Sequence, residues 1–254
     1  MLDQWLCESV RLSALWPIAP GKSSSPLTFK EFAGTDPDSR EEQLKFGMLR
    51  EVGTVLDGSV NLEMRQTPGR FDWIMGPVMQ VSVPASEATK FFHIGAVPDA
   101  IKRFSELPLL RVARDFAQPP RFAYGIVAYS TVNDVDASHR QLATLLHLKD
   151  FDLRDATEFA LQINRPRFSS VVKDLKINRL SRWATVRILG FHFAVPHGEK
   201  VVQPTSPPLV ATRVDIDVNT DENRSEPIPT DKIPNLLDEL TSFTLEIAEK
   251  GDVK

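Results

Sequence analysis

The sequence predicts an α+β fold in which antiparallel sheet carries its helices on one face. Several segments alternate apolar and polar residues, as half-buried strands do, and others have the 3.6-residue apolar spacing of amphipathic helices. The strands come in groups between the helices, an order that favours antiparallel sheet. No glycine-rich turn follows a predicted strand, which excludes a dinucleotide-binding βαβ fold.

The first half of the chain contains one predicted strand and one predicted hairpin. Residues 8–16 alternate and form the strand. Residues 55–66 and 70–76 alternate as well, and the Thr-Pro-Gly run at 67–69 between them is typical of a turn. These three segments predict the N-terminal part of the sheet.

The remainder of this half predicts loop and helix. Residues 17–41 are rich in proline, glycine and serine and predict a loop, with one turn of helix at 29–32. Apolar spacing predicts further helices at 86–93 and 99–107. A proline pair at 119–120 then marks a boundary, which predicts two α+β halves of similar size, residues 1–118 and 119–254, or else one continuous domain.

The second half predicts a group of strands and two helices. The strands are expected at 121–130, 157–165, 170–195 and 209–218. Asn133 or Asp134 caps a helix that continues to residue 147. The last helix spans 230–250, with Thr230 as its cap and Pro234 in its first turns.

Composition limits the classes of protein that remain. The chain has 254 residues, of which 42% are apolar and 25% charged, ordinary values that exclude collagen, coiled coils and wholly disordered proteins. The net charge of −4 argues against a protein that coats nucleic acid with its whole surface. Cys7 is the one cysteine, so no internal disulfide forms and a buried thiol in a reducing compartment is expected.

The N-terminal residues have no secretory h-region, and no run approaches the roughly 20 apolar residues of a membrane span. We therefore expect a cytoplasmic protein that does not contact membrane.

No familiar catalytic signature is present, and we predict no catalytic residue, no cofactor and no metal. His192 and His197 are five residues apart, but a zinc site needs at least one more ligand. Asp215 and Asp217 have the spacing that puts both carboxylates on one face of a strand. Such a pair could form an acidic site of a metal-dependent nuclease. The alternative, which we favour, is the solvent face of a strand.

Charge is distributed unevenly along the second half. Residues 161–190 contain seven basic residues and one acidic residue, a net charge of +6, whereas residues 214–254 contain four basic and eleven acidic residues, a net charge of −7. The basic segment is a candidate binding site for nucleic acid or a partner, through Arg165, Arg167, Lys173, Lys176, Arg179 and Arg182, with Trp183 or Phe168 stacking on bases. The alternative is neutralisation within the chain, which the nearly cancelling totals favour.

Three short motifs suggest a family. The runs QINRPR at 162–167, INRLSRW at 177–183 and VDIDV at 214–218 resemble a sporadically distributed family of uncharacterised prokaryotic proteins of about 250 residues. The resemblance implies no activity and no catalytic residues. A patchy distribution among prokaryotes is typical of accessory systems such as anti-phage defence.

Three functions remain open. The first is a non-enzymatic interaction or regulatory subunit of a prokaryotic multi-component system, whose partner is another subunit or a second copy of the chain. The second is a nucleic-acid-binding protein that uses the basic segment. The third is a metal-dependent nuclease centred on Asp215 and Asp217. The absence of a catalytic signature makes an enzyme the less expected outcome.

Overall fold

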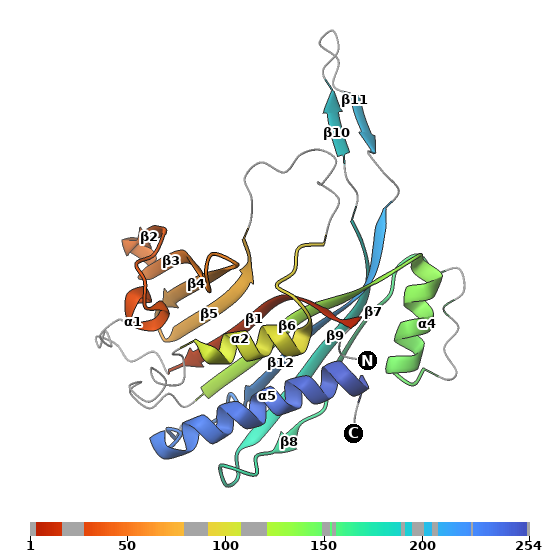
Figure 1. Cartoon of the computed structure of the whole chain (residues 1–254). Helices are drawn as coiled ribbons and strands as arrows, with labels where there is room; N and C mark the ends of the chain where they lie inside the picture. The colour runs from red at the N-terminus through yellow and green to blue at the C-terminus, as the bar shows by residue number, and fades with distance from the viewer. Residues whose placement is uncertain are drawn as a thin grey trace.

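The structure is a computed structural model, and it describes residues 4–16, 28–78, 91–107, 121–148, 153, 156–188, 191–194, 201–204, 208–224 and 226–252. Its main feature is one ten-stranded sheet with the order β2-β3-β4-β5-β1-β6-β12-β9-β7, in which β8 also pairs with β9 (Figure 1). All of these pairs are antiparallel, which confirms the predicted fold class. The strands are β1 (Leu6–Leu15), β2 (Ser39–Gln43), β3 (Met48–Val55), β4 (Val60–Thr67), β5 (Arg70–Pro77), β6 (Arg121–Val132), β7 (Ala160–Asn164), β8 (Arg167–Phe168), β9 (Lys176–Ile188) and β12 (Leu209–Thr220).

Strand β1 lies in the middle of the sheet and joins the two halves of the sequence. Leu12 lies opposite Trp73 of β5 on one side and opposite Tyr124 of β6 on the other. The sheet therefore runs without interruption through residues on both sides of the proposed boundary at 118/119. The predicted hairpin is present as β4 and β5, joined through Gly69 with a φ of 75°.

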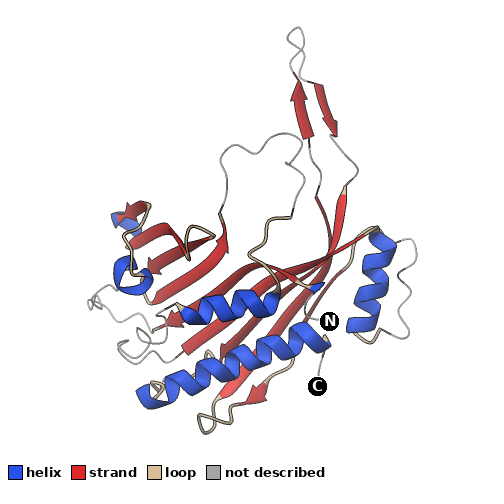
Figure 2. Ribbon diagram, viewed as in Figure 1, coloured by secondary structure: helices blue, strands red, loops and turns tan. Residues whose placement is uncertain are grey.

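The helices cover one face of the sheet, as the sequence predicts. They are α1 (Phe29–Ala33), α2 (Val97–Glu106), α4 (Val135–Leu145) and α5 (Ile233–Lys250). Helices α2 and α5 lie side by side across the central strands, while α4 lies at the end of the sheet that contains β9 and β12 (Figure 2). The expected cap of α4 is present, since Asp134 accepts a hydrogen bond from Ala137 N at 2.7 Å. The expectation that Thr230 caps the last helix is wrong, because Thr230 lies in a separate 3-10 turn at 230–232 and its side chain caps neither that turn nor α5.

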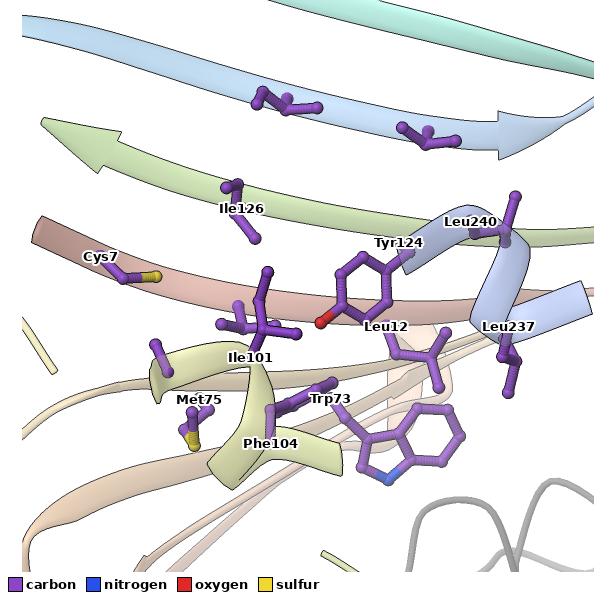
Figure 3. Packing of buried hydrophobic residues seen from close by; sticks show 14 of the residues in the cluster. Cys7, Leu12, Trp73, Met75, Ile101, Phe104, Tyr124, Ile126, Leu237 and Leu240 are labelled. Atoms are coloured by element: carbon purple, nitrogen blue, oxygen red, sulfur yellow. The ribbon is translucent and has the colours of Figure 1, made fainter. Parts of the chain in front are cut away.

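The core fills the space between these helices and the sheet. Cross-strand register places Trp73, Leu12, Tyr124 and Val218 in one row on the helix-covered face, and all four are buried. Figure 3 shows core side chains from both layers, among them Leu12, Tyr124 and Ile126 from strands and Ile101, Phe104, Leu237 and Leu240 from α2 and α5. The same row continues into β9, where Arg179 lies opposite Val218.

Several strands differ from the prediction. Strand β2 begins inside the segment expected to be loop and extends beyond it, and β3 lies almost wholly before the strand expected at 55–66. Strand β8 lies in the gap between the strands expected at 157–165 and 170–195. A smaller two-stranded sheet pairs β10 (Phe191–Ala194), which lies inside the strand segment expected at 170–195, with β11 (Val201–Pro204), which lies outside every predicted strand. The helix expected at 86–93 falls mostly outside the described residues, and residues 91–93 are not helical.

Candidate functional site

Three basic residues of the 161–190 segment form ion pairs with acidic residues of the C-terminal helix and of the bend that follows it. Arg165 donates to both carboxylate oxygens of Asp252, at 2.8 and 2.7 Å. Arg167 and Arg179 both donate to Oε2 of Glu246, each at 2.8 Å. We call these five residues the α5 ion-pair cluster. Opposite charges separated by more than 60 residues are thus paired within the chain, as the neutralisation alternative expects.

Arg179 is the most buried member of this cluster. Only 1% of its surface is exposed, and its guanidinium lies 5.2 Å from the ring centre of Phe243. Its Nε and Nη1 atoms have no hydrogen-bond partner among the described residues. Burial lowers the pKa of Arg179, and the charge of Arg167 lowers it further, while Glu246 and Asp252 oppose the shift. A guanidinium held in this way cannot contact a phosphate in solution.

The other three basic candidates are exposed. Lys173, Lys176 and Arg182 form no ion pair with any residue that the structure describes. Arg182 lies in the middle of β9, opposite Asp215 of β12 and opposite Gln162 of β7. Of the six basic candidates, these three side chains, spread along β9 and the turn before it, remain available to a partner.

The two aromatic candidates lie in opposite environments. Trp183 is fully buried on the helix-covered face, where its ring meets Trp5 edge to face with 6.1 Å between centroids. Its Nε1 donates to Ser181 Oγ at 2.9 Å. Trp183 is therefore a core residue, and the expectation that it stacks on bases is wrong. Phe168 in β8 is 73% exposed and faces solvent.

Asp215 and Asp217 share the face of the sheet opposite the helices, as their spacing predicts. Both carboxylate oxygens of Asp217 already accept hydrogen bonds within the chain. Oδ2 accepts one from Arg11 Nη2 at 2.5 Å, and Oδ1 accepts one from Asn219 at 2.8 Å. Asp215 is exposed. Among the described residues, no group of three or more His, Cys, Asp or Glu side chains could hold a metal ion.

Strand β7 presents an unpaired edge. Its inner side bonds to β9, since Arg165 N donates to Arg179 O at 3.2 Å and Thr185 N donates to Phe159 O at 3.1 Å. Phe159 and Arg165 flank β7 at odd-numbered positions, and successive residues of a strand turn their N–H and C=O groups to opposite sides. Ala160, Gln162 and Asn164 therefore direct their backbone groups away from the sheet. No described strand pairs with that side.

The two edge strands of the sheet, β2 and β7, differ in how strongly their side chains discourage pairing with a second chain. Strand β2 at the other edge carries Arg40, Glu41 and Glu42 in a fully exposed run, and such charges discourage a second chain from pairing. Strand β7, with the sequence ALQIN, contains neither charge nor proline. Its Leu161 and Ile163 are half-buried against the core. Among the described residues, no charge, proline or paired strand blocks strand addition at the β7 edge.

Two hollows adjoin the start of this edge. One has a volume of about 420 Å³ and a mostly apolar lining, made by Leu148, Leu153, Ala156, Glu158, Phe159, Ala160 and Leu161. The other has a volume of about 660 Å³ and is lined by Thr157, Glu158, Phe159, Ala160, Arg182, Ala184, Thr185 and Arg187. Glu158, Phe159 and Ala160 belong to both, so the start of the edge lies between a mostly apolar hollow and a charged one.

Cys7 has no sign of reactivity. The side chain is fully buried, and burial raises the pKa of the Cys7 thiol to about 12. A nucleophilic cysteine needs the opposite shift, because the thiolate is the reactive form. Cys7 is therefore a core residue, as the sequence predicts.

Comparisons with protein-family models, with curated proteins and with solved structures find no match for the chain. The resemblance carried by the QINRPR, INRLSRW and VDIDV motifs accordingly stays a prediction. None of the helices in the described part of the chain is both long and apolar enough to cross a membrane.

Proposed function

We propose that this protein is a non-enzymatic interaction subunit that binds a protein partner by strand addition at the β7 edge. The observation that carries the proposal is the outward-facing backbone of Ala160, Gln162 and Asn164 on a strand without charge or proline. An extended segment placed there would gain main-chain hydrogen bonds from the edge and specificity from alternate side chains. A prokaryotic, cytoplasmic setting in anti-phage defence remains a prediction from the family resemblance.

The described contacts favour a protein partner over the two alternatives. Nucleic-acid binding relies on cations that are free to neutralise phosphates, and Arg165, Arg167 and Arg179 are already paired with carboxylates. A nuclease centred on Asp215 and Asp217 would need both carboxylates for metal, and Arg11 occupies the second. The β7 edge has no such competing contact among the described residues.

The test replaces Gln162 by proline and captures partners from a native-like host. Proline at position 162 removes an N–H that points outward, so the β7–β9 hydrogen bonds remain intact. We expect the wild-type protein to retain a stoichiometric protein partner at high salt and Gln162→Pro to lose it. Gln162→Thr is the matched control, because threonine keeps the N–H and suits a strand; it should retain the partner.

Three results would contradict the proposal. Equal capture by Gln162→Pro would place the partner elsewhere on the surface. Nucleic acid that binds at low salt and is released at high salt would favour the nucleic-acid alternative instead. A wild-type protein that is a dimer in solution and becomes monomeric as Gln162→Pro would assign the edge to a second copy of the chain.

A further inference from the structure

The charged hollow at the start of β7 is lined by two arginines. Arg182 and Arg187 line it together with edge residues 157–160. Neither arginine forms an ion pair with a described residue. Arg187 is held at the rim, because its Nη2 donates to the backbone oxygen of Thr157 at 2.8 Å. Glu158 is the one acidic residue of the lining, so the hollow has an excess of positive charge.

The charged hollow lies beside the β7 edge, to which a partner strand would be added. Arg182 lies directly opposite Gln162 in the β7–β9 register, and both side chains are exposed on the face opposite the helices. A strand added to β7 continues the sheet about 4.8 Å further out. Every second side chain of that strand would lie on the same face as Arg182, next to Gln162.

The opposite face of an added strand meets apolar surface. Leu161 and Ile163 lie on the helix-covered side of β7. The apolar hollow that includes Leu148, Leu153 and Phe159 adjoins the same end of the edge. Side chains of an added strand would therefore meet apolar neighbours on one face and, on the other, the uncharged side chains of β7 with Arg182 at the charged hollow.

From this arrangement we infer that the occupant of the β7 edge is an extended segment of a partner protein that alternates apolar and acidic residues. The apolar side chains pack beside Leu161, Ile163 and the apolar hollow. An aspartate or glutamate enters the charged hollow and accepts hydrogen bonds from Arg182, which suits a carboxylate through its planar fork of donors. This inference rests on the proposed function, since it specifies what binds at the same edge.

Two six-residue fluorescent peptides test the inference. Both carry valine at alternate positions, and the intervening positions are glutamate in one peptide and lysine in the other. Fluorescence anisotropy at low salt measures their affinities for the full-length protein. We expect the glutamate peptide to bind at least about tenfold more tightly than the lysine peptide, which corresponds to about 1.4 kcal/mol.

Substitutions locate the source of the preference. Arg182→Gln should remove most of the difference between the two peptides. Lys176→Gln is the matched control, because Lys176 is an exposed cation on the same face of β9, six residues or roughly 20 Å away. It should leave the preference unchanged.

Failure of the inference and failure of the proposed function give different results. Equal binding of both peptides, abolished by Gln162→Pro, would overturn the acidic preference and leave the strand-addition edge in place. A preference that Arg182→Gln does not alter would also overturn the inference. Absence of binding by either peptide overturns the inference, and the proposed function is then decided separately by partner capture with Gln162→Pro.

Discussion

Glu246→Ala is expected to lower the free energy of unfolding by about 3 kcal/mol or more. The carboxylate of Glu246 is the hydrogen-bond partner of a guanidinium that is fully buried, that of Arg179. Removal of one member of a buried ion pair leaves an uncompensated charge in the core, which costs about 3–5 kcal/mol. The same substitution also releases Arg167, which shares Oε2 of Glu246. Urea unfolding monitored by circular dichroism measures the effect.

Two further variants separate this charge effect from lost helix contacts. Glu249→Ala changes an exposed glutamate of the same helix and should alter stability by less than about 0.5 kcal/mol. The double variant Arg179→Met with Glu246→Met removes both charges and should recover much of the loss, since apolar replacement of a whole buried pair is often neutral. A loss in Glu246→Ala no larger than in Glu249→Ala would show that Arg179 is not buried in solution.

Trp183→Ala is expected to lower the free energy of unfolding by about 3–5 kcal/mol, the usual range for a buried tryptophan. The ring is fully buried, packs edge to face on Trp5 and donates a hydrogen bond to Ser181. Its removal leaves a cavity beside the central strands and an unpaired hydroxyl. Thermal unfolding of the variant and the wild type measures the difference.

Phe168→Ala is the matched control for an aromatic residue in the same region. Phe168 is 73% exposed, so its loss should change stability by no more than about 0.5 kcal/mol. If Trp183→Ala were as stable as the wild type but bound nucleic acid more weakly, Trp183 would be a surface stacking residue and its placement in the core would be incorrect.

The sequence predicts most elements of the sheet, and two of the strands that it does not predict, β2 and β3, have a physical reason. Strand β2 is fully exposed, so no apolar residue marks an inward face. Strand β3 contains Glu51, which is buried on the helix-covered face and accepts hydrogen bonds from Phe29 N and Arg40. A buried carboxylate interrupts the alternation by which strands are recognised.

The site was only partly predictable for similar reasons. In β9 the face that turns toward α5 carries Arg179, Ser181 and Trp183, and the opposite face carries Leu180 and Arg182. Both faces mix polar and apolar residues, so the sequence cannot indicate which arginine is buried. The net charges of residues 161–190 and 214–254 are nearly equal and opposite, which favours pairing within the chain. The structure shows such pairs for Arg165, Arg167 and Arg179. The exposure of the β7 edge depends on strand order, which no local pattern encodes.

Hydrogen exchange of individual backbone amides tests the central claim most directly, because it reports which edge groups lack a partner. In the isolated protein, the amides of Ala160, Gln162 and Asn164 should exchange rapidly, while those of Leu161 and Ile163, which face β9, should exchange slowly. Addition of the glutamate peptide or of the captured partner should slow the first set. Rapid exchange at alternate positions that becomes slow on binding is the result that strand addition predicts. Protection of all five amides in the isolated monomer would show that the edge is already paired and would contradict the proposed function.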